Sequence, residues 1–143
     1  MILIWLRGKK LHLSKLLDKK SPKAAYDEEV VKKTYNKIIS LLVEERFFLN
    51  KNLKVSDLAS KLNQNEKIIS RSINRYGNGN FNAFVNSFRV EHAKELLLSG
   101  QYDHYTIEAI ALESGFANKV SFYNAFKSVT GMSPKEFKAV KQP

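Results

Sequence analysis

The sequence predicts an all-α protein of about seven helices. Apolar residues recur at intervals of three and four positions in several separate segments, which is typical of amphipathic helices. Asn, Ser or Thr precedes several of these segments and glycine follows them, as is common at helix starts and ends. Two pairs of short helical segments have the layout of a helix-turn-helix, and a longer segment joins the pairs. We therefore expect two helix-turn-helix subdomains joined by a central linker helix, plus an N-terminal extension.

The bulk composition favours a small basic protein with a polyanionic partner. Of the 143 residues, 43% are hydrophobic, which suffices for several small cores. The formal net charge of +10 favours nucleic acid as the partner, with an anionic membrane surface as the second choice. The absence of cysteine from the sequence excludes disulfides, thiolate zinc sites and cysteine nucleophiles.

The first 26 residues are expected to form an N-terminal extension or linker. Residues 1–6, MILIWL, are apolar, and a basic cluster of Arg7, Lys9 and Lys10 follows them. This run is far shorter than the ~20 residues that span a bilayer. Two interpretations stay open. The segment is either a short amphipathic stretch that packs on the domain or frays, or the cytoplasmic end of a truncated membrane helix with Trp5 at the interface.

The first helix-turn-helix subdomain is expected at residues 27–80. A long amphipathic helix runs to about residue 48, and its inward face carries Val31, Tyr35, Ile38, Leu42 and Val43. Two shorter helices follow at residues 55–62 and 66–76, and Gly77 ends the second of them. The outward side of the helix at 66–76 carries Lys67, Ser70, Arg71 and Asn74.

The linker helix is expected at residues 81–99, with its helical run at 81–98. Its apolar residues face both halves: Phe84, Val85, Phe88, Ala93, Leu96 and Leu97. Such a helix is ~27 Å long. Residues 57–76 and 109–130 share a weakly repeated layout, so this rod would hold two similar units about one DNA turn apart, ~34 Å.

The second helix-turn-helix subdomain is expected at residues 100–143. Thr106 is suited to cap its first helix, Gly115 to make the turn, and Asn118 to cap the second helix. The inward face of that second helix is expected to carry Phe122, Ala125, Phe126 and Val129. Its polar face carries Lys119, Ser121, Tyr123, Asn124 and Lys127. Ser133 and Glu136 form the pattern of a capping box for a last short helix.

These residues resemble the AraC/XylS family of bacterial transcription regulators. The resemblance covers roughly residues 34–140, and its specific part is the pattern IAxxSGFxNxxxFxxAFKxxxGMSPxEF at residues 110–137. It implies an all-α domain of about seven helices, whose two recognition helices enter successive major grooves of DNA. Members of the family usually carry a further domain that binds a ligand or dimerises, and these 143 residues contain no counterpart of it.

The resemblance also implies which side chains touch DNA. The base-facing positions of the two units correspond to Lys67, Ser70, Arg71, Lys119, Ser121 and Asn124. Lys127 would lie near the DNA backbone, and Asn74 and Asn118 complete the set of expected DNA-binding residues. The sequence departs from the family at Asn124, where arginine is frequent. The missing arginine argues against a guanine contact from the second helix, and asparagine can pair with adenine instead. Val120, in place of a polar residue, can touch a thymine methyl group.

Several of these residues also have a purely structural interpretation. Asn65 and Asn118 are expected first of all to cap helices. Arg89 is expected either to pair with a nearby carboxylate or to touch the DNA backbone. The phenylalanines have helical spacing and are expected in the core, which argues against a stacking platform for single strands.

Enzyme chemistry, metal sites and cofactors are not expected. His12, His92 and His104 are scattered, and the sequence around His92 lacks the paired histidines of a zinc helix. The leading prediction is sequence-specific binding of double-stranded DNA for transcription regulation in the cytoplasm of a bacterium. RNA polymerase and a sensor or dimerisation domain joined through the N-terminus are candidate further partners. The alternatives are the output domain of a membrane-tethered sensor and a helical protein-interaction module whose basic charge only confers solubility.

Overall fold

The computed structural model describes residues 27–141, and within them the fold is all α. The α-helices are α2 (Glu28–Glu44), α3 (Val55–Leu62), α4 (Glu66–Tyr76), α5 (Phe81–Leu98), α6 (Ile107–Glu113), α7 (Lys119–Thr130) and α8 (Pro134–Lys141). Two 3-10 turns, η1 (Phe47–Leu49) and η2 (Gly100–Tyr102), complete this part of the chain. The predicted fold class is thereby confirmed. The two interpretations of residues 1–6 lie outside the described residues, among which no helix is long and apolar enough to cross a membrane.

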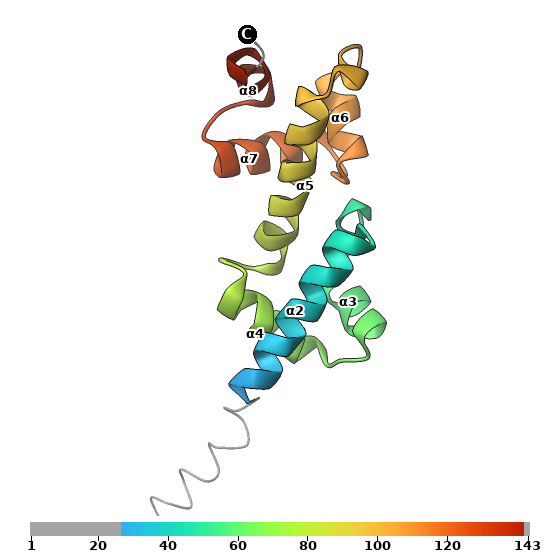
Figure 1. Ribbon diagram of the computed structural model, residues 1–143, viewed down its shortest axis with the longest axis vertical. Coiled ribbons are helices and arrows are strands. Elements are labelled where there is room, and N and C mark those ends of the chain that lie inside the picture. Colours follow the sequence, from blue (N-terminus) through green and yellow to red (C-terminus); the bar gives the residue numbers. More distant parts are fainter. Residues whose placement is uncertain (1–26, 142–143) are drawn as a thin grey trace, which may run out of the picture.

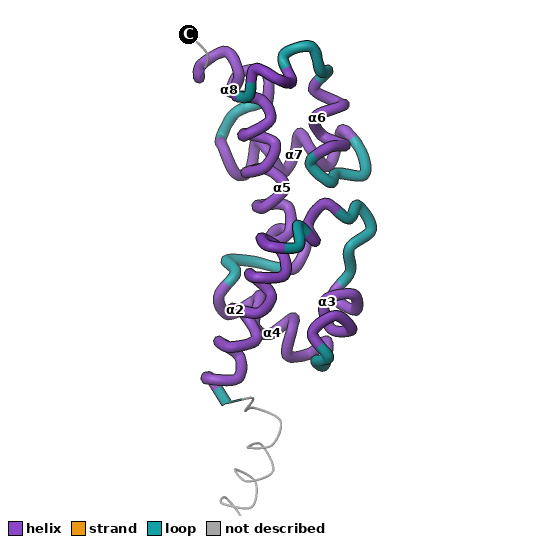
Figure 2. The backbone as a smooth tube through the Cα atoms, turned by 45° about the vertical axis from the view of Figure 1, so that its right-hand side comes forward, coloured by secondary structure: helices purple, strands orange, loops and turns teal. Residues whose placement is uncertain are grey.

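Helix α5 lies between two groups of helices. Figure 1 shows α2, α3 and α4 below its midpoint and α6, α7 and α8 around its upper half. The turned view of Figure 2 shows the same separation. In Figure 1 the helices α4 and α7, each the second of its helix-turn-helix, both lie toward the left, whereas α3 and α6 lie to the right.

Each group of helices has a hydrophobic core of its own. The first core gathers residues of α2, η1, α3, α4 and the start of α5, including Ile38, Leu42, Leu58, Ile69 and Phe84. The second core gathers residues of α6, α7, α8 and the rest of α5, including Val90, Leu97, Ile110, Phe122 and Phe126. Because α5 contributes to both cores, one continuous helix supports both helix-turn-helix units.

Capping side chains start the helices where the sequence predicts. Thr106 Oγ1 accepts a hydrogen bond from the backbone N–H of Ala109 at 3.1 Å, and Asn118 Oδ1 accepts one from Ser121 at 2.9 Å. The capping box of α8 is also confirmed. The Ser133 N–H donates to Glu136 Oε2 at 2.7 Å, and the Glu136 N–H donates to Ser133 Oγ at 3.2 Å. These bonds satisfy backbone donors that would otherwise lack partners at helix starts.

Two residues predicted to face inward are on the surface. Val43 is 54% exposed and Val129 is 45% exposed. Val43 follows the buried Leu42 by one residue, which turns it about 100° away from the core. The helix also ends at Glu44 and not near residue 48, because Arg46 has a left-handed backbone with φ of 52° and η1 follows. Val129 lies in the last turn of α7, where it lines a groove instead of the core.

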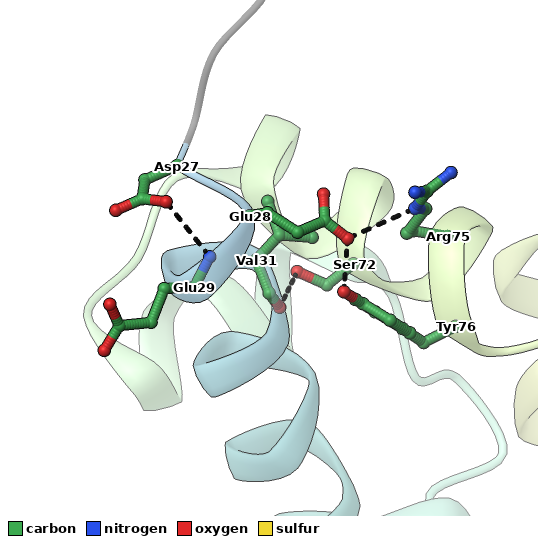
Figure 3. A network of polar contacts seen from close by, with 7 residues as sticks. All are labelled: Asp27, Glu28, Glu29, Val31, Ser72, Arg75 and Tyr76. Atoms are coloured by element: carbon green, nitrogen blue, oxygen red, sulfur yellow. Dashed lines mark hydrogen bonds and ion pairs between the residues drawn. The ribbon is translucent and has the colours of Figure 1, made fainter.

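The start of α2 is joined to the end of α4 by a polar network (Figure 3). The Tyr76 hydroxyl donates a hydrogen bond to Glu28 Oε1, and Arg75 Nε donates to the same oxygen at 3.3 Å. Below them, the buried Ser72 hydroxyl lies 3.0 Å from the Val31 carbonyl oxygen. The Tyr76 hydroxyl, and then Arg75, hold the pKa of Glu28 below its ordinary value of 4.5. The network therefore secures the C-terminal end of α4 through an ionised carboxylate.

Replacing Glu28 with glutamine is expected to reduce the loss of stability on acidification. A carboxylate whose folded pKa is lowered contributes stability above its unfolded pKa, and that contribution disappears as the pH falls through the folded value. The wild-type chain should therefore lose it as the pH falls below about 5 and through the lowered pKa of Glu28, and Glu28→Gln should lose less over the same range. Urea denaturation at several pH values measures this. The control Glu29→Gln removes a carboxylate from the same helical turn without touching Arg75 or Tyr76, and equal profiles for both variants would contradict the assignment.

Candidate nucleic-acid interface

The outward face of α4 presents the first set of predicted DNA-binding residues. Ile69 and Ile73 are fully buried on the inward face, which fixes the orientation of the helix. Lys67, Arg71 and Asn74 consequently lie exposed, whereas Ser70 is half-buried. Asn65 precedes them as the N-cap and accepts a hydrogen bond from the Lys67 N–H at 2.8 Å.

Helix α7 presents the second set in the same way. Phe122 and Phe126 are fully buried. The predicted residues of this unit lie exposed on and before the helix: Asn118, Lys119, Ser121, Asn124 and Lys127. Val120 is 69% exposed, so its methyl groups are available to a partner. Asn118 Oδ1 is engaged as the helix cap, and the backbone N–H groups at the start of the helix are donors that suit an anion.

A groove of about 580 Å³ lies between α7 and the segment that directly follows α4, Gly77 and Asn78. Helix α5 contributes to its lining, and the polar side chains along it are neutral: Asn78, Asn86, Ser87, Ser121, Asn124 and Ser128. The structure thus brings Ser121 and Asn124 together with four polar residues that the sequence did not single out. Those four come from three segments, so spacing along the chain carries no signal for them.

Lys119 has a partner in the structure. Its ammonium lies 2.5 Å from Glu108 Oε1 and 5.5 Å from the centre of the Tyr123 ring. The hydrogen bond from Lys119 lowers the pKa of Glu108, and the same bond raises the pKa of Lys119. Because both side chains are about half exposed, the pair contributes little to stability. A phosphate near the start of α7 would have to compete with this carboxylate for Lys119.

Arg89 does not have either role that the sequence suggested. It is only 9% exposed, and its guanidinium donates to the Phe48 carbonyl at 2.8 Å, to the Asn50 carbonyl at 2.7 Å and to Asn86 Oδ1 at 3.0 Å. Burial lowers the pKa of Arg89. The prediction of a carboxylate partner or a DNA contact is therefore wrong, since the buried guanidinium donates instead to two backbone carbonyls of a distant segment and to the side-chain oxygen of Asn86.

Comparison with known protein families identifies the fold. A family profile described as "Helix-turn-helix domain" matches residues 58–139. An uncharacterized HTH-type transcriptional regulator of Staphylococcus aureus is 29% identical over 117 residues, which are 76% of this chain but 15% of that protein. The TCP pilus virulence regulatory protein of Vibrio cholerae is 29% identical over 118 residues, which are 75% of this chain and 41% of that protein. The chain thus spans less than half the length of these relatives.

Solved structures share the architecture. The C-terminal domain of AraT, a response regulator from Geobacillus stearothermophilus, matches with a TM-score of 0.63 and 25% identity, covering 83% of this chain and 91% of that one. The DNA-binding domain of AdpA, solved in complex with a target DNA, matches with a TM-score of 0.61 and 20% identity, covering 74% and 90%. Since the family profile covers more than half of the sequence, the chain belongs to the AraC-type helix-turn-helix family of DNA-binding domains in transcriptional regulators.

Proposed function

We propose that the chain binds double-stranded DNA sequence-specifically by placing α4 and α7 in successive major grooves. The observation that carries this proposal is that α4 and α7 each expose a polar face, with a groove beside α7 that α5 and the residues directly after α4 also line. Two such helices on one face of a duplex contact two major grooves about one turn apart. The related fold of AdpA, which was solved with a target DNA, supports the same use of this architecture.

The side chains suggest a division between base and phosphate contacts. Arg71 is suited to guanine, because a guanidinium can pair with two acceptors on that base, and Asn124 is suited to adenine. Ser70, Ser121 and Asn74 can form single hydrogen bonds to either bases or phosphates. Lysine side chains are point charges suited to phosphates, and we assign that role to Lys67, Lys119 and Lys127.

In this proposal the groove beside α7 contacts the DNA backbone. Between two adjacent major grooves on one face of DNA lies the minor groove, bordered by sugar-phosphate backbones. That backbone would cross the groove between α7 and the segment after α4, which asparagine and serine side chains line. Neutral hydrogen-bonding groups of this kind commonly contact phosphate oxygens.

Selection of binding sites from random duplexes tests the proposal. A bipartite sequence should be enriched, and the chain should protect two major-groove patches over roughly 17–20 base pairs, about two turns. Affinity should fall steeply with salt, because several phosphates are neutralised. Failure to bind any duplex at low salt would instead favour the helical protein-interaction module.

Replacing Glu108 with glutamine is expected to raise the affinity for duplex DNA about two- to fivefold at low salt, in keeping with the modest strength of an exposed ion pair. The change releases Lys119 from its partner and makes the ammonium available to a phosphate. Fluorescence anisotropy over a range of salt concentrations measures it. The matched control is Glu113→Gln, which removes the same charge from the other end of α6. Equal gains for both variants would show that only net charge matters.

Replacing Ser128 with aspartate is expected to weaken binding to all duplexes about tenfold, because the new carboxylate would face the phosphates that cross the groove. Ser60→Asp in α3 is the control. Both serines are exposed and stand two residues before the last residue of their helices, so the unfavourable interaction with the helix dipole is matched. Equal binding by the two variants would show that DNA does not pass over the groove.

The remaining assignments follow from the proposed activity. A bacterial DNA-binding regulator works in the cytoplasm, and RNA polymerase and a sensor or dimerisation domain are the proposed further partners. Tethering through residues 1–6 is a separate proposal. Hydrophobic spans in frame upstream of the Met1 codon would support a tether, and a ribosome-binding start at that codon would remove it.

A further inference from the structure

The turn between α6 and α7 lies directly against η1, which belongs to the other subdomain. A Cβ atom at Gly115 would lie 2.7 Å from the Phe48 carbonyl oxygen and 2.8 Å from Leu49 Cα. Backbone atoms cannot move aside as the end of a side chain can. Gly115 also has a φ of 89°, which glycine adopts without steric cost. The two helix-turn-helix units therefore touch backbone to backbone at this point.

Arg89 of α5 also contacts both η1 and the turn that contains Gly115. Its guanidinium group donates to the carbonyls of Phe48 and Asn50, as described above. The guanidinium carbon lies 5.8 Å from the centre of the Phe116 ring. Phe116 directly follows Gly115 and is 1% exposed in the second core. Arg89 thus lies between η1 and the turn of the second unit.

Segment η1 is itself well anchored. Phe48 is 7% exposed and belongs to the first core, and its ring stacks on Phe88 with centroids 6.4 Å apart. Without the contact between η1 and Gly115, α5 would be the main connector of the two units. Two units that are joined mainly through one helix share few contacts, and a low density of contacts is typical of parts that move relative to one another.

We propose that η1, Arg89 and Gly115 form a clamp that fixes the distance and angle between α4 and α7, and thereby the half-site spacing that the chain accepts. The spacing part of this inference rests on the proposed DNA recognition by α4 and α7. Arg89 and Gly115 act here as positioning residues, because neither lies on the outward faces of those helices.

Two glycines provide a matched test of the clamp. Gly115→Ala places a methyl group against η1. Gly131→Ala meets the same unfavourable positive φ, 79°, but its Cβ would have no atom within 4 Å. The full chain has no cysteine, so nitroxide labels can be attached through Ser60→Cys on α3 and Leu112→Cys on α6. Both positions are exposed and lie off the recognition helices.

Pulsed electron paramagnetic resonance then measures the distance between the labels without DNA. We expect a narrow distribution for the wild-type background and for Gly131→Ala, and a shifted or broader one for Gly115→Ala. Arg89→Lys should also broaden the distance distribution, because an ammonium group lacks the planar set of donors that bonds two carbonyls at once. Circular dichroism establishes that each variant is folded. If Gly115→Ala does not fold, the distance distribution of Arg89→Lys tests the clamp. Folded variants with the wild-type distribution would overturn the clamp.

Binding to spaced duplexes tests the consequence for recognition. The probes are the duplex obtained by selection and the same duplex with one base pair inserted between its halves, which adds ~3.4 Å and about a tenth of a turn. Wild type and Gly131→Ala should lose at least about tenfold in affinity on insertion, because both halves can no longer be engaged at once. Gly115→Ala and Arg89→Lys should lose at most about threefold, since a looser connection tolerates the new geometry.

The two readouts separate the clamp from the proposed function. If the distances change as expected but every variant discriminates the spaced duplexes as the wild type does, the clamp does not set the spacing. If no duplex is bound at all, the proposed function fails, and the distance measurement still decides whether η1 holds the two units together.

Discussion

Replacing Phe122 with alanine is expected to destabilise the protein by about 3–5 kcal/mol, the usual cost of removing a buried phenylalanine. Phe122 is fully buried in the second core, and its ring packs edge-on against Phe116 and Phe126 with centroids 5.1 and 5.5 Å apart. Since small domains are stable by about 5–15 kcal/mol, this loss would remove a large share of the free energy of unfolding. Denaturant unfolding measures the loss in free energy.

The separate cores allow a sharper readout of the same variant. Backbone amides of α6 to α8 should lose hydrogen-exchange protection more than those of α2 to α4, because the damage lies in the second core. Val120→Ala is the matched control on the same helix, and its stability should stay within about 0.5 kcal/mol of the wild type, as for most exposed positions. A uniform loss of protection throughout the chain would mean that the two cores unfold as one unit.

Replacing Arg71 with alanine is expected to weaken binding to the selected duplex by about 1–3 kcal/mol, and to weaken binding to random duplexes less. The reason is that a base contact discriminates among sequences, whereas a phosphate contact does not. Competition assays on the selected duplex and on variants at each position measure both effects. Preference at one base position should relax in this variant.

Two further substitutions in α4 make the result interpretable. Lys67→Ala should weaken binding to all sequences similarly and reduce the salt slope by about one, as for a phosphate contact. Arg75→Ala removes an arginine one turn further along, which is held by Glu28, and should leave the sequence preference unchanged. Equal losses on selected and random DNA for Arg71→Ala would mean that Arg71 only positions the protein.

Much of the framework could be predicted from the sequence. The ranges of α3, α4 and α5 agree with the predicted ones, and Asn65, Thr106, Asn118 and the Ser133–Glu136 box cap helices as expected. The pattern at residues 110–137 also pointed to the right family, because the family profile places the chain among the helix-turn-helix domains of transcriptional regulators. The DNA-binding residues themselves stay a prediction that the proposed experiments test.

Contacts between side chains and distant elements could not be predicted from the sequence. The buried Arg89 side chain donates a hydrogen bond to the Phe48 carbonyl, and Lys119 forms an ion pair with Glu108. Val129 lines a groove. Each outcome depends on which distant element lies opposite the side chain. The pattern of a helix tells which residues share a face, but not what covers the last turn of that face.

The sequence by itself determined the helices, their caps and the all-α family, because capping bonds and helical periodicity act over three or four residues. Only the tertiary structure decided the contact of Gly115 with η1 and the roles of Arg89 and Glu108. The physical reason is the separation in sequence of the residues that make these contacts. These contacts join segments that are 11 to more than 60 residues apart in the sequence, and packing of the two cores brings them together.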